Sequence, residues 1–109
     1  MSDPAAIIAA RLAELWRTSR PSILERIAAL HAAHDALVRD PADTEARSKG
    51  REAAHKLSGV LGVFGMPQGS ELSFNMESLL MNGNPLSFED VIWLGEQIEA
   101  LDAVIAAKG

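Results

Sequence analysis

The side chain best placed for chemistry in this sequence is the imidazole of His55, within the run Arg51–Gly65. Read as a helix, this run carries a buried apolar stripe, and His55 falls on a neighbouring stripe with Ser58, Gly59 and Gly62. Helical side chains lean toward the N-terminus, so residues 58 and 59 should lean over the imidazole, and both are small. Each glycine costs about 1 kcal/mol relative to alanine inside a helix. The pattern therefore indicates either a deliberately uncovered imidazole or close packing of another helix.

An uncovered imidazole at this position could act as a nucleophile. The reference pKa of histidine is about 6.5, so an exposed ring is largely neutral near pH 7 and keeps one nitrogen lone pair. Arg51 lies one turn before His55, and Lys56 follows it in sequence. These two cations could flank an anionic group carried on the ring.

Other arrangements of reactive residues carry less weight. His31 and His34 are spaced to share a metal, but no cysteine or matching carboxylate–histidine pair completes a ligand set. His34 also falls on an apolar stripe, which favours a hydrogen-bonded, half-buried histidine. No motif places a strained serine nucleophile beside a base, and no Walker-type phosphate loop is present. We therefore expect no metal site and no hydrolase or nucleotide-binding activity.

Helical spacing of apolar residues runs through most of the chain, and no segment alternates with period two. The pattern predicts an N-terminal helix that starts at Ser2–Asp3–Pro4, continues to about Ser19 and breaks before Pro21. Asn82–Pro85 is the plainest loop. Four main helices are predicted: about 22–38, about 43–64, a third that follows the break at Gly65–Gly69 and runs to about 81, and a last one from 87 to the C-terminus. We expect an all-α, antiparallel up-down four-helix bundle with an additional short N-terminal helix.

The composition of the chain narrows the possible domain count, partners and location. The 109 residues are 48% hydrophobic and 23% charged, which suits one globular domain spanning 1–109. The net charge of −5 disfavours a nucleic-acid surface, and the absence of cysteine excludes disulfides. No apolar run reaches the length of a membrane span, and the start lacks a signal-peptide pattern. We expect a cytoplasmic monomer that binds neither nucleic acid nor membrane.

The run around His55 resembles the signature of histidine-containing phosphotransfer (HPt) domains, which are four-helix bundles of multistep two-component signalling. The similarity extends to the next predicted helix and, with the bundle pattern, covers most of the chain. The residues that carry it are Ala54–Gly59, Leu61, Phe64–Gly65, Leu72 and Met76–Glu77.

The resemblance implies that His55 accepts a phosphoryl group from a receiver-domain aspartate and passes it to another receiver. It implies that Gly59 clears the approach, and that Glu77 holds one ring nitrogen as a proton donor. The implied partners are response-regulator receivers, a hybrid sensor histidine kinase, or both. Such domains are phosphocarriers without ATP-dependent kinase activity and need no cofactor of their own. The magnesium used in transfer belongs to the receiver.

The sequence departs from the family pattern in one place. Many members carry lysine three residues after the histidine, where this chain has Ser58. Lys56 or Arg51 could supply the positive charge instead. The departure also keeps open an alternative function, in which the bundle binds a receiver or kinase as an interaction module without exchanging phosphate.

Overall fold

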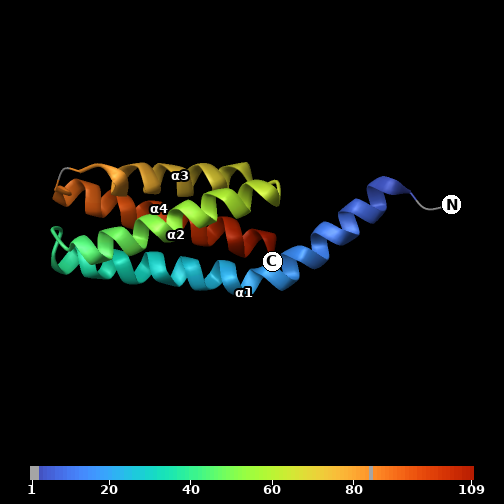
Figure 1. The fold of residues 1–109 in the computed structure, drawn as a ribbon, viewed down its shortest axis with the longest axis horizontal. Helices are drawn as coiled ribbons and strands as arrows, with labels where there is room; N and C mark the ends of the chain where they lie inside the picture. The colour runs from blue at the N-terminus through green and yellow to red at the C-terminus, as the bar shows by residue number, and fades with distance from the viewer. Residues whose placement is uncertain (1–2, 84) are drawn as a thin grey trace.

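The computed structural model describes residues 3–83 and 85–109, and in these residues the secondary structure is entirely helical. The four helices are α1 (Pro4–Arg39), α2 (Thr44–Val63), α3 (Pro67–Met81) and α4 (Phe88–Lys108). Each packs against its neighbours in chain order, and α4 closes the ring against α1 (Figure 1). Short connections make neighbours antiparallel. The all-α prediction and the boundaries of the last three helices are confirmed to within a few residues.

The separate N-terminal helix is not confirmed, because α1 is one helix of 36 residues that continues through Pro21. Proline removes a backbone hydrogen bond and costs about 3 kcal/mol inside a helix. Trp16 and Ile23 are buried on either side of it, so packing holds both halves in place. The Thr18 hydroxyl also donates to the carbonyls of Glu14 and Leu15, both at 3.1 Å. A proline bends a helix, and so does a threonine hydroxyl that bonds to carbonyls of the preceding turn. Figure 1 shows α1 changing direction where it leaves the bundle.

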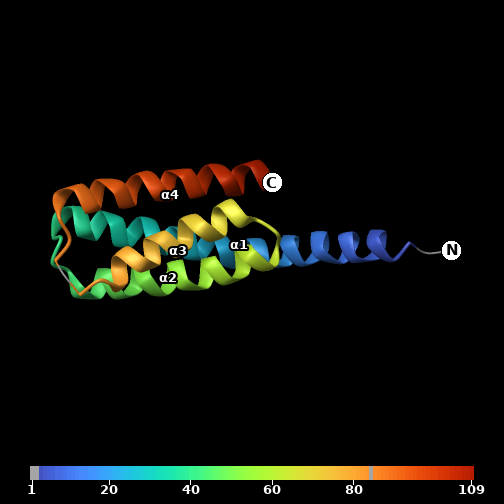
Figure 2. The same cartoon turned by 90° about the horizontal axis from the view of Figure 1, so that it is seen from above.

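The first part of α1 extends beyond the bundle (Figures 1 and 2). We call Pro4–Leu15 the arm. Asp3 caps its start by accepting a hydrogen bond from the Ala5 amide at 3.0 Å, while Ser2 lies outside the described residues. The arm leaves the bundle at the end where α2 finishes, α3 begins and the C-terminus lies. No helix of the described residues lies beside it along its length (Figures 1 and 2).

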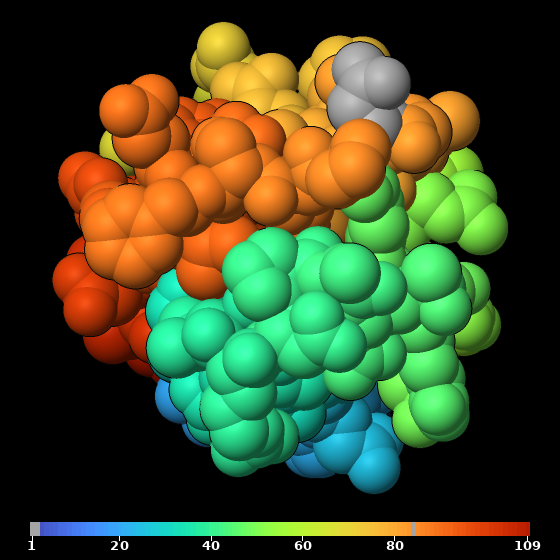
Figure 3. Space-filling model, turned by 90° about the vertical axis from the view of Figure 1, so that its left-hand side faces the viewer, coloured from blue at the N-terminus to red at the C-terminus, as the bar shows by residue number. Residues whose placement is uncertain are grey.

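The bundle core is an apolar column drawn from all four helices. Leu37, Leu57, Met76 and Leu101 are completely buried in it. At one end, the α1–α2 and α3–α4 connections lie side by side over the core (Figure 3). Leu86 of the second connection is buried, whereas Asn84 of the predicted Asn82–Pro85 loop lies outside the described residues.

Local sequence signals mark the ends of the helices. Gly65 adopts φ +67°, a left-handed conformation that favours glycine, and it ends α2 as predicted. Ser87 and Asp90 form the predicted capping box at the start of α4, with reciprocal bonds of 3.0 and 2.9 Å. Trp16 Nε1 donates to the Gly109 carbonyl at 3.1 Å, which ties the end of α4 to α1. None of the described helices is both long and apolar enough to cross a membrane.

Candidate functional site

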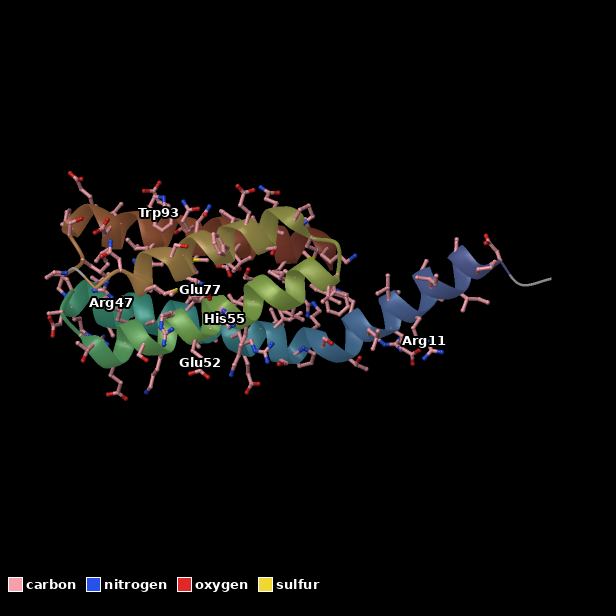
Figure 4. All side chains as sticks on the ribbon, turned by 45° about the horizontal axis from the view of Figure 1, so that its top comes forward. Arg11, Arg47, Glu52, His55, Glu77 and Trp93 are labelled. Atoms are coloured by element: carbon pink, nitrogen blue, oxygen red, sulfur yellow. The ribbon has the colours of Figure 1, made fainter. Side chains whose placement is uncertain are left out.

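The site is built on the facing surfaces of α2 and α3. Ala54 and Leu57 are buried on α2, and this orients His55 outward between them, with 76% of its side chain exposed. Glu77 lies on α3 with only 12% of its side chain exposed. The imidazole Nδ1 and Glu77 Oε2 are 2.5 Å apart (Figure 4). The structure thus brings together two residues that are 22 positions apart in sequence.

The partner of Nδ1 fixes which tautomer the ring adopts. An ionised carboxylate can only accept hydrogen bonds, so Nδ1 carries the ring proton and its N–H donates the hydrogen bond to Glu77. The lone pair of the neutral ring is then on Nε2, the ring nitrogen farther from the backbone. Among the described residues, Nε2 has no hydrogen-bond partner. The arrangement therefore presents an oriented nucleophilic nitrogen to solvent.

The cations beside His55 differ in their partners. Lys56 Nζ is 2.9 Å from Glu52 Oε1, in a favourable i, i+4 pair. The hydrogen bond from Lys56, and then the charges of Lys56 and Arg51, lower the pKa of the Glu52 carboxyl. Arg51 is exposed one turn before His55 and forms no ion pair with a described residue. Arg51 is therefore the cation with fewer competing contacts near the imidazole.

The glycines of α2 fall into two groups. A Cβ added to Gly59 would meet no described side chain within 4 Å, and at Gly62 it would only touch Ser70 Oγ at 3.6 Å. At Gly50 it would lie 3.1 Å from the Ala33 Cβ and 3.2 Å from Leu80 Cδ1. Close helix packing thus explains Gly50, but it explains neither glycine near His55. Gly59 leaves the surface beside the imidazole open.

An open hollow of about 640 Å³ lies between α2 and α3, one turn along from His55. Ser58 lines it, and the Ser58 carbonyl accepts a hydrogen bond of 2.7 Å from Ser70 Oγ. Phe74 also lines it and is 55% exposed. Ser70 and Phe74 were not predicted as site residues from the sequence. The available signal for Phe74 was a large aromatic side chain on the exposed stripe of α3, one turn before Glu77.

The other two histidines have separate structural partners. His31 Nε2 lies 2.8 Å from Asp102 Oδ2, and His34 Nε2 lies 3.0 Å from the carbonyl oxygen of Val91. The expectation that His34 is hydrogen-bonded and half-buried is confirmed. In the described part of the chain, no group of three or more metal-ligating side chains comes together.

Comparison with known proteins gives one result. A family model described as the Hpt domain matches residues 11–106. No match was found among curated proteins or among solved structures. The family match begins within the arm and takes in all of the bundle up to the last turn of α4, including the His55–Glu77 pair. Since it covers most of the sequence, the chain belongs to the Hpt domain family.

Proposed function

We propose that the protein is a phosphocarrier, and that His55 takes a phosphoryl group from one receiver-domain aspartate and transfers it to another. The observation that carries the proposal is the His55–Glu77 pair, in which a buried carboxylate holds Nδ1 and leaves Nε2 exposed. Membership of the Hpt family supports phosphotransfer as the kind of chemistry. We place the phosphoryl group on Nε2.

In the transfer step, the Nε2 lone pair attacks the phosphorus of an aspartyl phosphate. A nitrogen–phosphorus bond forms, the phosphorus–oxygen bond to the aspartate breaks, and the carboxylate leaves with the electron pair. The proton on Nδ1 stays in its hydrogen bond with Glu77, so the ring gains positive charge. The Glu77 carboxylate stabilises this charge, and transfer back to a second aspartate reverses each change.

The remaining site residues support positioning and charge. Phosphoryl transfer depends mainly on in-line positioning and on stabilisation of the transferring oxygens. Arg51 supplies a positive charge on the His55 face, while Lys56 can leave Glu52 to join it. Gly59 and the hollow lined by Ser58 and Phe74 give a receiver room to approach along the groove between α2 and α3.

Transfer of radiolabel from a phosphorylated receiver domain tests the proposal directly. The wild-type chain should acquire phosphate that is labile in acid and stable in base, as phosphohistidine is. His55→Gln should acquire none. His31→Gln is the matched control, because it removes another exposed imidazole paired with a carboxylate and should leave labelling unchanged.

The same assay distinguishes the alternative of an interaction module. A chain that binds receivers but never acquires label, and whose binding is unchanged in His55→Ala, would be such a module and would refute the phosphocarrier. Label that persists in His55→Gln would also contradict the proposal. Circular dichroism of each variant checks that the bundle is folded.

A further inference from the structure

A hollow of about 350 Å³ lies between α1 and α4, at the end of the bundle opposite the arm (Figures 1 and 3). Three exposed apolar side chains border it. They are Val38 of α1, which is 59% exposed, and Phe88 and Ile92 of α4, which are 78% and 47% exposed. Leu37 and Val91 also line the hollow and belong to the buried core. We call this apolar hollow the α1–α4 groove.

The lining of the α1–α4 groove is held in place by a contact between the two helices. His34 of α1 lines the groove, and its Nε2–H donates to the Val91 carbonyl of α4 at 3.0 Å. The ring fits there because residue 95 is glycine, since a Cβ added to Gly95 would lie 2.7 Å from His34 Nε2. The groove is therefore preformed, and a preformed site loses less free energy to ordering when a partner binds.

Charge is distributed unequally along the chain, and the α1–α4 groove lies partly on its acidic half. Residues 57–109 carry seven acidic side chains and one basic side chain, Lys108, for a net charge of −6, whereas residues 1–56 have a net charge of +1. Glu96 and Glu99 line the groove, are exposed and form no ion pair with a described residue. No lysine or arginine stands among its described lining residues. This uncompensated negative charge favours a cationic partner and disfavours nucleic acid or an anionic membrane.

The direction of the α1–α4 groove indicates the shape of that partner. Phe88, Ile92, Glu96 and Glu99 follow one stripe of α4, at spacings of four, four and three residues. At about 1.5 Å per residue, this stripe extends for about 16 Å, or about three helical turns. The backbone groups of α1 and α4 are bonded within their own helices, so a partner strand could not pair with them. A helix lying along the groove is the mode of recognition that remains.

We propose that the α1–α4 groove binds a basic amphipathic helix of a partner protein. An apolar side chain of that helix lies among Val38, Phe88 and Ile92, and lysine or arginine side chains one to two turns away face Glu96 and Glu99. The apolar contact supplies most of the affinity, because exposed ion pairs contribute little. The two carboxylates select the sign of charge on the partner and fix its direction along the groove.

The α1–α4 groove and the phosphotransfer site lie on opposite sides of the bundle. The four described helices pack as a ring, in which α1 contacts α2 and α4 but not α3. The His55–Glu77 pair joins α2 and α3, so it lies diagonally across the ring from the groove. A partner in the groove therefore leaves Nε2 of His55 accessible to a receiver, and the two kinds of binding can be tested separately.

Fluorescence polarisation of a labelled peptide tests the charge part of the proposal on the full chain. The probe is a peptide of leucine and lysine in helical spacing, about 14 residues long, so that it covers the groove. The wild-type chain should bind it, and Glu96→Gln/Glu99→Gln should weaken binding by at least about fivefold. Glu25→Gln/Glu71→Gln is the matched control, because it removes two exposed carboxylates outside the groove, and it should bind as wild type does.

The same assay tests the apolar part of the proposal. Val38→Ser removes an apolar contact at the rim and should weaken binding of the leucine–lysine peptide by at least about fivefold. Val63→Ser is the matched control, because Val63 is 70% exposed at the end of α2 and does not line the groove. This variant should bind the peptide as wild type does. Circular dichroism checks that each variant is folded.

Several results would overturn the proposal. Equal weakening in the two double glutamine variants would show that binding follows net charge alone. Equal binding of a peptide with serine in place of leucine, or with glutamate in place of lysine, would remove the amphipathic basic helix as the partner. Sedimentation in which wild type is a dimer and Val38→Ser a monomer would show that a second copy covers the groove.

The proposal stands or falls independently of phosphotransfer. His55→Gln should bind the leucine–lysine peptide as wild type does, because His55 lies across the bundle from the groove. A saturating concentration of the peptide should leave transfer of label from a receiver to wild type unchanged. Competition between the peptide and the receiver would place the peptide on the His55 side and contradict the proposal.

Discussion

Replacing Gly59 should affect the stability of the fold and the rate of phosphotransfer in opposite directions. A Cβ at this position would meet no described side chain within 4 Å, and the backbone is an ordinary helix interior. Gly59→Ala should therefore stabilise the protein by about 0.5–1 kcal/mol, through the higher helix propensity of alanine. For a chain of this size the melting temperature should rise by roughly 2–8 °C.

Two other glycines of α2 calibrate this expectation. Gly62→Ala places a Cβ in ordinary contact with Ser70 Oγ at 3.6 Å, near the helix end, so it should change stability little or raise it slightly. Gly50→Ala places a Cβ 3.1 Å from the Ala33 Cβ. Overpacking costs about 1–3 kcal/mol, which exceeds the gain in propensity, so this variant should be destabilised. Urea denaturation measures the free energy of unfolding of all three alanine variants.

Phosphotransfer should respond in the opposite direction. Leucine at position 59 is a better helix former than glycine, so Gly59→Leu should fold at least as stably as wild type. Its side chain would stand one turn from His55, where a receiver must approach. Transfer should slow by at least about tenfold, which corresponds to ~1.4 kcal/mol in the barrier. Transfer at the wild-type rate, or a loss of stability in Gly59→Ala, would refute the reasoning.

The remaining predictions concern residues that contact the rings of His55 and His34. Glu77→Gln can still accept a hydrogen bond from Nδ1 of His55, but it loses the negative charge. Because a hydrogen bond to a charged group is worth about 1.5–3 kcal/mol, transfer should slow by about 10–100-fold. Rapid-quench labelling measures this rate, and an unchanged rate would exclude charge stabilisation by Glu77. Gly95→Ala would place a Cβ 2.7 Å from His34 Nε2, so it should cost about 1–3 kcal/mol in urea denaturation.

Most of the fold could be predicted because the local signals agree with one another. Apolar spacing, the Gly65 stop and the Ser87 capping box each mark a boundary that the structure reproduces. Pro21 is the exception. The sequence predicted a break there, since a proline costs more than any single neighbour gains. The burial of Trp16 and Ile23 on both sides of it depends on helices distant in sequence, so no local pattern could reveal a continuous α1.

The candidate site was predictable in part. The small residues beside His55 are visible as spacing, and the structure shows that packing does not require Gly59. Glu77 was suggested only through the family resemblance, although its own position held a signal. It occupies the buried stripe of α3 with Met76 and Leu80, where a carboxylate needs a partner. The i, i+4 spacing of Glu52 and Lys56 is visible in the sequence, but their ion pair was not predicted from it.

The described residues contain two imidazole–carboxylate pairs, and the differences between them indicate which ring suits the proposed phosphotransfer. His31 binds Asp102 through Nε2, which leaves only Nδ1, the ring nitrogen nearer its own backbone. His55 binds Glu77 through Nδ1 and leaves the outer nitrogen free. Asp102 is 43% exposed, so water screens its charge, whereas Glu77 is shielded and acts on the ring at low dielectric. These differences support the proposal that the phosphoryl group is carried by His55, whose outer ring nitrogen is free and whose carboxylate partner is shielded, and not by His31.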